Sequence, residues 1–474
     1  MREYLKFYID GQWVDPIEPA ALDVDNPTTE VVSGRIALGT AADVDRAVKA
    51  ARKAFGTWSQ TTREERLDVL QAIMAEYQKR AGDLADAVNE EMGAPVSLAA
   101  GPQVGLGLGH LATAMEVLKN FEFEEQHGST LVVKEPIGVC GLITPWNWPI
   151  NQIACKVFPA LATGCTMVLK PSEVAPYSAQ IFTEVMDAAG VPAGVYNLVY
   201  GDGPGVGVAL ATHPDIDMVS FTGSTRAGIE VARNAAPTVK RVHQELGGKS
   251  PNLVLPDADL ATQLPAVAMG PLVNTGQSCI SPTKVLVAKD REAEVVSFYK
   301  NMYSATPVGD PMAEGNHLGP VVNKAQFEKV RSLIQSAIDE GAKLETGGPD
   351  LPSNVNRGYY IQPTVFSGVT PDMRIANEEI FGPVATIMTY DTLDQGIELA
   401  NATEYGLSAA ITGDPAKAAS VAGKLRAGMV AINNWGPTPG APFGGYKQSG
   451  NGREGGLAGL KDFMETKAIS GLPA

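Results

Sequence analysis

Residues that commonly bind metals or form covalent links are scarce in this sequence. Its 474 residues include four cysteines and five histidines, and no C-x-x-C or H-E-x-x-H spacing occurs among them. We therefore expect no metal site. Low cysteine usage fits a reducing compartment. Cys140, Cys155 and Cys165 lie in apolar segments and are predicted to be buried in the core.

Positive charge and long apolar runs are lacking as well. The formal net charge is −16, which argues against nucleic acid or an anionic membrane surface as a partner. The N-terminus lacks the basic and apolar regions of a secretory signal. No uninterrupted apolar run reaches the length of a membrane span. The sequence therefore predicts a soluble protein of the cytoplasm.

What the sequence does contain is a regular alternation of strands and helices. Short apolar strands alternate with helices from about residue 137, and a second such run extends from 250 to 435. This pattern is typical of βαβ units and of a parallel sheet covered on both faces. Asp-Gly between two strand-like runs predicts a hairpin at 7–14. Helical periodicity predicts a long helix at 324–341.

The charged, alternating stretch 119–136 differs from both α/β runs. Its pattern predicts an exposed hairpin, and exposed strand edges invite pairing with another chain. From the sequence alone, an arm that contacts another subunit and an isolated surface hairpin are equally good interpretations.

Three residues could carry chemistry. Cys279 lies among small and polar residues in NTGQSCISPTK (274–284), which suits a nucleophile with an approachable face, although it could simply pack. Asn147, in the turn TPWNWP, has a neutral amide that could stabilise an oxyanion or merely shape the turn. Glu245, in HQELGGKSPN, could be a general base or a solvated glutamate.

Two segments could bind a nucleotide. FTGSTRAG places Gly223 and Ser224 between a strand and a helix, where a pyrophosphate can meet backbone N–H groups. G-x-G-x-x-G is absent, so an ordinary turn is the alternative. VLKPSE places Lys170 and Glu173 at the sheet edge where nucleotides bind, unless they form a plain solvated ion pair. A carboxylate there would repel a 2′-phosphate, which favours NAD over NADP.

A further segment, NEEIFGPV (377–384), contains two adjacent glutamates. Glu378 and Glu379 should point to different faces, so that one can bind a ligand while the other is solvated. The run APFGGYKQSGNGREGG (441–456) is rich in glycine and predicts either a shaped loop or a disordered one.

In this order, these segments resemble the aldehyde dehydrogenase superfamily. The matching segments are PWNWP, KPSE, FTGST, ELGGKSPN, GQSC, EEIFGP and PFGGYKQSGNGRE, which span 145–453. The resemblance implies an aldehyde dehydrogenase-like α/β fold with a Rossmann-type cofactor domain, an α/β catalytic domain and a β-hairpin oligomerisation arm. The implied boundaries are 1–118 and 137–248 for the NAD-binding domain, 249–448 for the catalytic domain, and 119–136 with 449–474 for the arm and C-terminal segment.

The resemblance also implies a role for each matching residue. Cys279 would be the nucleophile, Asn147 and the Cys279 backbone N–H the oxyanion hole, and Glu245 the general base. The residues implied to bind the cofactor are Lys170 and Glu173 at the adenosine ribose, Gly223 and Ser224 at the pyrophosphate, Glu379 at the nicotinamide ribose, and Phe381 and Trp146 beside the nicotinamide. Those implied near the substrate entrance are Trp148, Trp435 and Phe443.

The implied reaction is oxidation of an aldehyde to the carboxylic acid by a homodimer or homotetramer. NAD would be the cofactor, with NADP possible, and the reaction would pass through a thiohemiacetal and a thioester on Cys279. The helical region 101–120 is apolar and carries no arginine. Because a substrate carboxylate would usually need a guanidinium partner, we expect an uncharged hydrophobic or aromatic aldehyde.

Three other functions compete with this one. A cysteine hydrolase that pairs Cys279 with His243 would need no cofactor, but would leave Lys170, Glu173 and Glu379 unexplained. A relative that transfers the acyl group to CoA would have little use for a water-activating base. A catalytically silent NAD-binding protein would have no need of the intact set of catalytic candidates.

Overall fold

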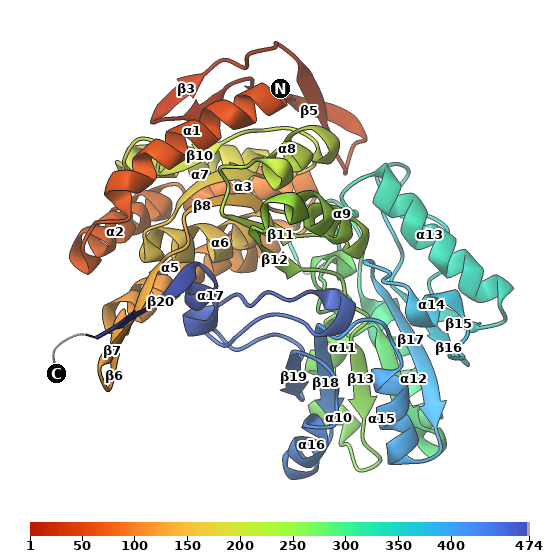
Figure 1. Ribbon diagram of the computed structural model, residues 1–474. Helices are drawn as coiled ribbons and strands as arrows, with labels where there is room; N and C mark the ends of the chain where they lie inside the picture. The colour runs from red at the N-terminus through yellow and green to blue at the C-terminus, as the bar shows by residue number, and fades with distance from the viewer. Residues whose placement is uncertain (316, 472–474) are drawn as a thin grey trace.

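The computed structural model describes residues 1–315 and 317–471, so the last three residues of the predicted segment 449–474 lie outside the described chain. The described residues form two seven-stranded sheets and two three-stranded sheets. Figure 1 shows one large sheet built mainly from the first half of the chain and the other from the second half.

The first large sheet has the strand order β12-β11-β8-β9-β10-β2-β3. Its strands are β2 (Phe7–Ile9), β3 (Gln12–Val14), β8 (Val139–Ile143), β9 (Thr166–Lys170), β10 (Tyr196–Leu198), β11 (Met218–Thr222) and β12 (Arg241–Glu245). The strands from β8 to β12 run parallel. β8, β9 and β11 are buried at every position, which explains their continuous apolar sequences.

The antiparallel pair β2–β3 confirms the hairpin predicted at 7–14. Asp10 and Gly11 form its turn, and both have positive φ, as expected for an Asp-Gly hairpin turn.

The strand order of the first sheet reverses between β8 and β11. From β8 the chain adds β9 and β10 on one side, and then returns to add β11 and β12 on the other. In parallel α/β sheets, ligands bind beyond the carboxyl ends of the strands at such a reversal. PWNWP follows β8 and the TGST turn follows β11, so two of the predicted site segments begin at this point.

Helices cover the first sheet on both sides. In Figure 1 the sheet lies between α1 on one side and α5 and α6 on the other. The helices are α1 (Ala41–Trp58), α2 (Arg63–Lys79), α3 (Ala81–Met92), α4 (Val96–Leu98), α5 (Val104–Asn120), α6 (Pro149–Thr163), α7 (Tyr177–Ala188), α8 (Val208–Thr212) and α9 (Thr225–Ala235). α6 is buried along almost its whole length, because it packs against β8, β9 and α5.

The second large sheet has the order β15-β16-β17-β14-β13-β18-β19. Its strands are β13 (Pro251–Val254), β14 (Lys284–Ala288), β15 (Lys343–Thr346), β16 (Thr364–Ser367), β17 (Val384–Tyr390), β18 (Ser408–Thr412) and β19 (Met429–Ile432). The helices of this region are α10 (Leu260–Gln263), α11 (Pro265–Met269), α12 (Glu292–Ala305), α13 (Lys324–Asp339), α14 (Arg374–Asn377), α15 (Leu393–Asn401) and α16 (Pro415–Ala422). α13 confirms the long helix predicted at 324–341.

The predicted hairpin at 119–136 is one part of a three-stranded arm. β6 (Glu124–His127) and β7 (Thr130–Pro136) form the hairpin, and β20 (Met464–Ser470) pairs with β7 along its full length. α17 (Gly456–Asp462) leads into β20. The interpretation as an isolated hairpin is therefore wrong, because the C-terminal strand completes the sheet.

The remaining small sheet lies near the N-terminus and consists of β1 (Arg2–Tyr4), β4 (Ala21–Asn26) and β5 (Val31–Ala37). The boundaries of the three predicted domains stay a prediction.

Candidate active site

Cys279 follows a short left-handed turn. Asn274, Thr275 and Gly276 all have positive φ, of 54°, 55° and 74°. For residues other than glycine this conformation costs roughly 1–2 kcal/mol each, so the surroundings must hold it. The Asn274 side chain donates to the Asn147 carbonyl at 2.7 Å, and the Thr275 hydroxyl donates to a backbone carbonyl at 3.1 Å. Backbone strain held by buried hydrogen bonds is typical of functional sites.

The turn after β8 is tied directly to the segment that carries Cys279. Asn147 Nδ2 donates to the Gln277 carbonyl at 3.1 Å, and Trp148 Nε1 donates to Ser278 Oγ at 2.8 Å. Asn147 is 4% exposed. The Gln277 carbonyl uses one of the two N–H donors of this amide, and the other can serve an oxyanion that forms beside Cys279.

Glu245 ends β12, and the two glycines after it bring the chain close to the rest of the site. A Cβ at Gly248 would lie 2.5 Å from the Cys279 carbonyl oxygen. A Cβ at Gly247 would lie 2.6 Å from a carboxylate oxygen of Glu379. Any larger residue would push these segments apart, so the Gly-Gly turn brings the candidate base, the candidate nucleophile and Glu379 into one site.

The charged groups of this site are poorly solvated. Glu245 is 1% exposed, and neither of its carboxylate oxygens has a hydrogen-bond partner in the described chain. Burial raises its pKa well above the usual value, and the nearby Glu454 adds to the rise. Burial, together with Glu379 and Glu245, also raises the pKa of the Cys279 thiol. Cys279 therefore holds its proton at neutral pH, while Glu245 is a stronger base than a solvated glutamate.

Cys279 opens into a cavity of about 390 Å³. Trp148, Trp435 and Phe443, the three residues predicted at the substrate entrance, all line this cavity. No lysine or arginine lines it in the described part of the chain. Its walls therefore suit a ligand that is apolar and carries no negative charge.

A second cavity, of about 540 Å³, is lined by both Ser224 and Glu379. Ser224 caps the N-terminus of α9, and Glu379 accepts a hydrogen bond from the Gly248 N–H at 3.0 Å. Glu378 also lines this cavity, but its side chain is 48% exposed and is paired with Arg374. The two adjacent glutamates thus have the different environments that the sequence predicted.

Of the other predicted cofactor residues, Trp146, Lys170, Glu173 and Gly223 lie at or just after the carboxyl ends of strands of the first sheet, and Phe381 precedes β17 of the second sheet. The rings of Trp146 and Phe381 are 5.3 Å apart and meet edge to face at 88°. At the end of β9, Lys170 Nζ lies 2.7 Å from a Glu173 carboxylate oxygen. Gly223 directly follows β11. A helix N-terminus that suits phosphate and two carboxylates that suit ribose hydroxyls form a donor and acceptor set that fits a dinucleotide.

Sequence reasoning missed a buried ion pair beside the substrate cavity. Lys156 on α6 lies 2.5 Å from Glu454, and their side chains are 0% and 6% exposed. Glu454 lines the cavity, and so does Cys155, which was predicted only as a core residue. The available signal was a lysine inside the otherwise apolar helix NQIACKVFPALA, because a lysine is almost never fully buried without a partner.

His243, the alternative partner of Cys279 in a hydrolase, makes its contacts elsewhere. Its Nδ1 lies 2.9 Å from Ser220 Oγ, and it is not among the residues that line the cavity with Cys279. The described contacts therefore give no support to a Cys279–His243 pair.

Comparison with known proteins identifies the family. A model described as the aldehyde dehydrogenase family matches residues 13–469. The chain belongs to the aldehyde dehydrogenase family. It is 51% identical to the 3-succinoylsemialdehyde-pyridine dehydrogenase of a Pseudomonas species, over 99% of each chain. The family match confirms the predicted resemblance and identifies the protein as an oxidoreductase that acts on aldehydes.

Two solved structures of this family have the same fold. An aldehyde dehydrogenase from Bartonella henselae is 47% identical with a TM-score of 0.97, over 99% of this chain and all of that one. A mutant aldehyde dehydrogenase C from Pseudomonas syringae, in complex with NAD+ and octanal, is 52% identical with a TM-score of 0.97, over 98% and 96% of the two chains. The predicted α/β aldehyde dehydrogenase-like fold is confirmed.

The described residues contain neither a membrane-spanning helix nor a cluster of metal ligands. No helix there is both long and apolar enough to cross a bilayer. No cluster of three or more histidine, cysteine, aspartate or glutamate residues suitable for a metal ion occurs in that part of the chain.

Proposed function

We propose that the protein oxidises uncharged aldehydes to carboxylic acids with NAD, through a thioester on Cys279. The observation that carries this proposal is the position of Cys279, which faces an apolar cavity while its own segment contacts both Asn147 and the Gly-Gly turn after Glu245. The relative from Pseudomonas syringae that was solved with NAD+ and octanal supports both the cofactor and the class of substrate.

The chain's own residues suit each step of that reaction. As its thiol proton passes to a water molecule, the Cys279 sulfur bonds to the aldehyde carbon, and the alkoxide oxygen accepts hydrogen bonds from the Asn147 amide and the Cys279 backbone N–H. One such donor contributes roughly 3–4 kcal/mol of transition-state stabilisation. When bound, NAD supplies the hydride acceptor. Glu245 then takes a proton from a water molecule, whose oxygen attacks the Cys279 thioester and releases the acid.

The cofactor proposal rests on the matching residues at the edge of the first sheet and in the segment 379–381 before β17. Glu173 would repel a 2′-phosphate, so NAD is expected to be preferred, with NADP possible. The residues proposed to hold the cofactor are Lys170 and Glu173 at the adenosine ribose, Gly223 and Ser224 at the pyrophosphate, Glu379 at the nicotinamide ribose, and Trp146 and Phe381 beside the nicotinamide.

The substrate proposal rests on the lining of the cavity. Trp148, Trp435 and Phe443 provide aromatic walls, and the described lining has no cation to pair with a substrate carboxylate. The relative named 3-succinoylsemialdehyde-pyridine dehydrogenase supports an aldehyde that carries an aromatic ring.

A panel of octanal, benzaldehyde and succinic semialdehyde, each with NAD and with NADP, tests both proposals. NADH formation measured at 340 nm should give the highest kcat/KM for the two uncharged aldehydes. A clear preference for succinic semialdehyde would overturn the substrate proposal.

Assembly and location remain proposals as well. The three-stranded arm supports a homodimer or homotetramer, because an open strand edge invites pairing with a second chain. Sedimentation equilibrium would distinguish these states from a monomer. The cytoplasmic location rests on the sequence, and fractionation of the source cells would test it.

A further inference from the structure

One face of β12 presents three polar side chains that lead from the arm to the active site. Arg241, His243 and Glu245 are alternate residues of the strand, so they point to the same side at intervals of about 7 Å. Arg241 donates to the backbone carbonyl of Asp462, at the end of α17, and to that of Met464, at the start of β20. Glu245 lies in the active site. His243 lies between them and is 3% exposed, and the proposed reaction gives it no role.

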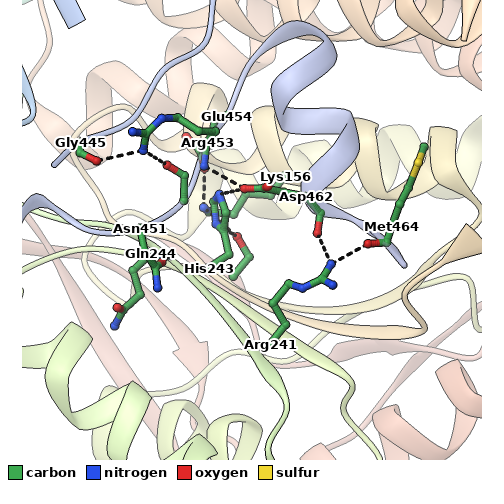
Figure 2. A network of polar contacts seen from close by, with 12 residues as sticks. Lys156, Arg241, His243, Gln244, Gly445, Asn451, Arg453, Glu454, Asp462 and Met464 are labelled. Atoms are coloured by element: carbon green, nitrogen blue, oxygen red, sulfur yellow. Dashed lines mark hydrogen bonds and ion pairs between the residues drawn. The ribbon is translucent and has the colours of Figure 1, made fainter. Parts of the chain in front are cut away.

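His243 lies in a network of polar contacts with Lys156 and Glu454 (Figure 2). Within it, a line of hydrogen bonds joins Glu454, Lys156, Ser220 and His243 in this order. Lys156 donates to Glu454 at 2.5 Å and to Ser220 Oγ at 3.1 Å. Because an ammonium group can only donate, Ser220 Oγ must accept from it, and the Ser220 hydrogen is assigned to His243 Nδ1, 2.9 Å away. Nδ1 is then the acceptor and Nε2 carries the hydrogen. Nε2 makes no hydrogen bond within the described chain, although a carboxylate oxygen of Asp462 lies 3.3 Å away.

The surroundings keep the His243 ring neutral and in place. Burial, and then the nearby Lys156 ammonium, lower the pKa of His243 to about 4. A Cβ at Gly452 would lie 2.3 Å from Nε2, so the glycine-rich segment closes directly over the ring. At neutral pH the ring can therefore go on accepting the Ser220 hydrogen.

Glu454, at the other end of this line of hydrogen bonds, lies in the active site. Glu454 lines the substrate cavity together with Cys279. Burial is the largest single effect on Glu454 and opposes its ionisation, but Lys156, His243 and the hydrogen bond from Lys156 together lower the pKa of that carboxyl group.

Glu454 pairs with Phe443 through two backbone hydrogen bonds, and the next residue, Gly444, lies against Glu245, because a Cβ there would lie 2.6 Å from a Glu245 carboxylate oxygen. The negative charge of Glu454 therefore lies near Glu245, and it raises the pKa of Glu245 more than Lys156 lowers it.

We propose that His243 and Ser220 are positioning residues for deacylation, because by holding Lys156 against Glu454 they keep a negative charge beside Glu245. The inference rests on the proposed function, in which Glu245 is the general base. A carboxylate beside a like charge binds a proton more tightly and is a stronger base. Without Ser220, the ammonium would lose one of its two acceptors. A proton could then pass from Lys156 Nζ to Glu454 Oε1, leaving an uncharged amine and an uncharged carboxyl group in a site where charge is costly.

Other groups face this line and contribute to its electrostatics. They are Cys155 and Lys156 on α6, Arg453 and Glu454 in the glycine-rich segment, Asp462 on α17, Arg241 on β12 itself, and Cys279 across the cavity.

The test measures how fast the acyl-enzyme decays as a function of pH. Enzyme is mixed with NAD and octanal, quenched at set times, and its acyl adduct is followed by intact mass. In Ser220→Ala and His243→Leu the acid-side inflection of this decay should move to lower pH, because Glu454 raises the pKa of Glu245 more than Lys156 lowers it, and both charges are lost together. The plateau rate at high pH should fall, because the base is weaker. The first burst of NADH and the KM for NAD should stay unchanged.

Conservative variants serve as controls. His243→Asn keeps an acceptor for the Ser220 hydroxyl, and Ser220→Thr keeps the hydroxyl, so both should retain the wild-type profile. The inference is overturned if Ser220→Ala has a wild-type melting temperature and its acyl-enzyme decay keeps the wild-type inflection pH. It is also overturned if the decay rate falls while the inflection pH stays the same. Ser220→Ala decides the question alone if His243→Leu does not fold. Glu245→Gln distinguishes a failure of the positioning role from a failure of the proposed function. If acyl-enzyme decay is undiminished in that variant, Glu245 is not the general base and the proposed function is overturned as well.

Discussion

The groups at the reacting centre and those proposed at the adenosine ribose differ in how their charges are paired. Glu245 is 1% exposed and its carboxylate has no partner in the described chain. Lys170 and Glu173 are already paired at 2.7 Å, and the Glu173 side chain is 37% exposed. The group that must exchange protons, Glu245, is thus unpaired and shielded from solvent. In such a place each nearby charge has a large effect on its pKa. A group that only holds a ligand keeps a partner and contact with solvent. Substitutions at the reacting centre should therefore reduce activity strongly, whereas substitutions at the proposed ribose site should reduce it little.

The largest effect is expected at Cys279. Cys279→Ala removes the atom that bonds to the aldehyde, so NADH formation should fall by on the order of 10^4 or more. The melting temperature and the affinity for NAD, measured by fluorescence titration, should change little. A residual rate within tenfold of wild type would remove Cys279 from the mechanism.

Glu245→Gln should come next. It keeps the shape of the side chain but cannot accept a proton, so steady-state turnover should fall by roughly 10²–10⁴. A burst of about one NADH per active site should remain, because hydride transfer precedes deacylation. In the wild type, the deacylation rate should rise with pH through the raised pKa of Glu245, since only the ionised carboxylate can take the proton. A flat wild-type profile would contradict this role.

A smaller loss is expected at Asn147. Asn147→Ala removes one donor from the oxyanion, and kcat should fall by roughly 10²–10³ with a modest change in KM. The buried Asn274 side chain, which donates to the Asn147 carbonyl, would lose no partner by this change. If instead KM rose and kcat were unchanged, Asn147 would bind the substrate without stabilising the alkoxide.

The smallest effect is expected at Glu173. Glu173→Gln removes the charge that would repel a 2′-phosphate, so the ratio of kcat/KM for NAD to that for NADP should fall by about fivefold or less, as for other exposed charges. Glu294→Gln, a change at an exposed glutamate of α12 that is paired with Arg291 and lines neither cavity, should leave the ratio unchanged. If the ratio changed equally in both variants, the change would reflect the net charge of the protein and not a contact between Glu173 and the cofactor.

The parts of the fold that depend on local chemistry could be predicted from the sequence. Asp-Gly fixed the turn between β2 and β3, and an amphipathic pattern indicated α13 to within two residues of its C-terminal end. The order of seven short motifs identified the family. Each of these signals lies within a short stretch of the chain.

The parts that depend on distant residues could not be predicted. β20 pairs with β7, more than 300 residues earlier, and neither strand indicates the other. The left-handed turn at 274–276 contains two residues that disfavour its conformation, and it is held by contacts from elsewhere in the chain. Lys156, Ser220 and Glu454 come from three separate segments, so only the folded chain brings them together.

The late position of β20 has a consequence for biosynthesis. β20 leaves the ribosome more than 300 residues after its partner strand β7, and the segment that supplies Glu454 and closes over His243 emerges just before β20. A nascent chain can fold its earlier α/β units as they emerge, but the edge of β7 stays uncovered and the substrate cavity lacks the wall that contains Glu454 until these residues have been made. Chains that are truncated before residue 450 should therefore be inactive and prone to aggregate.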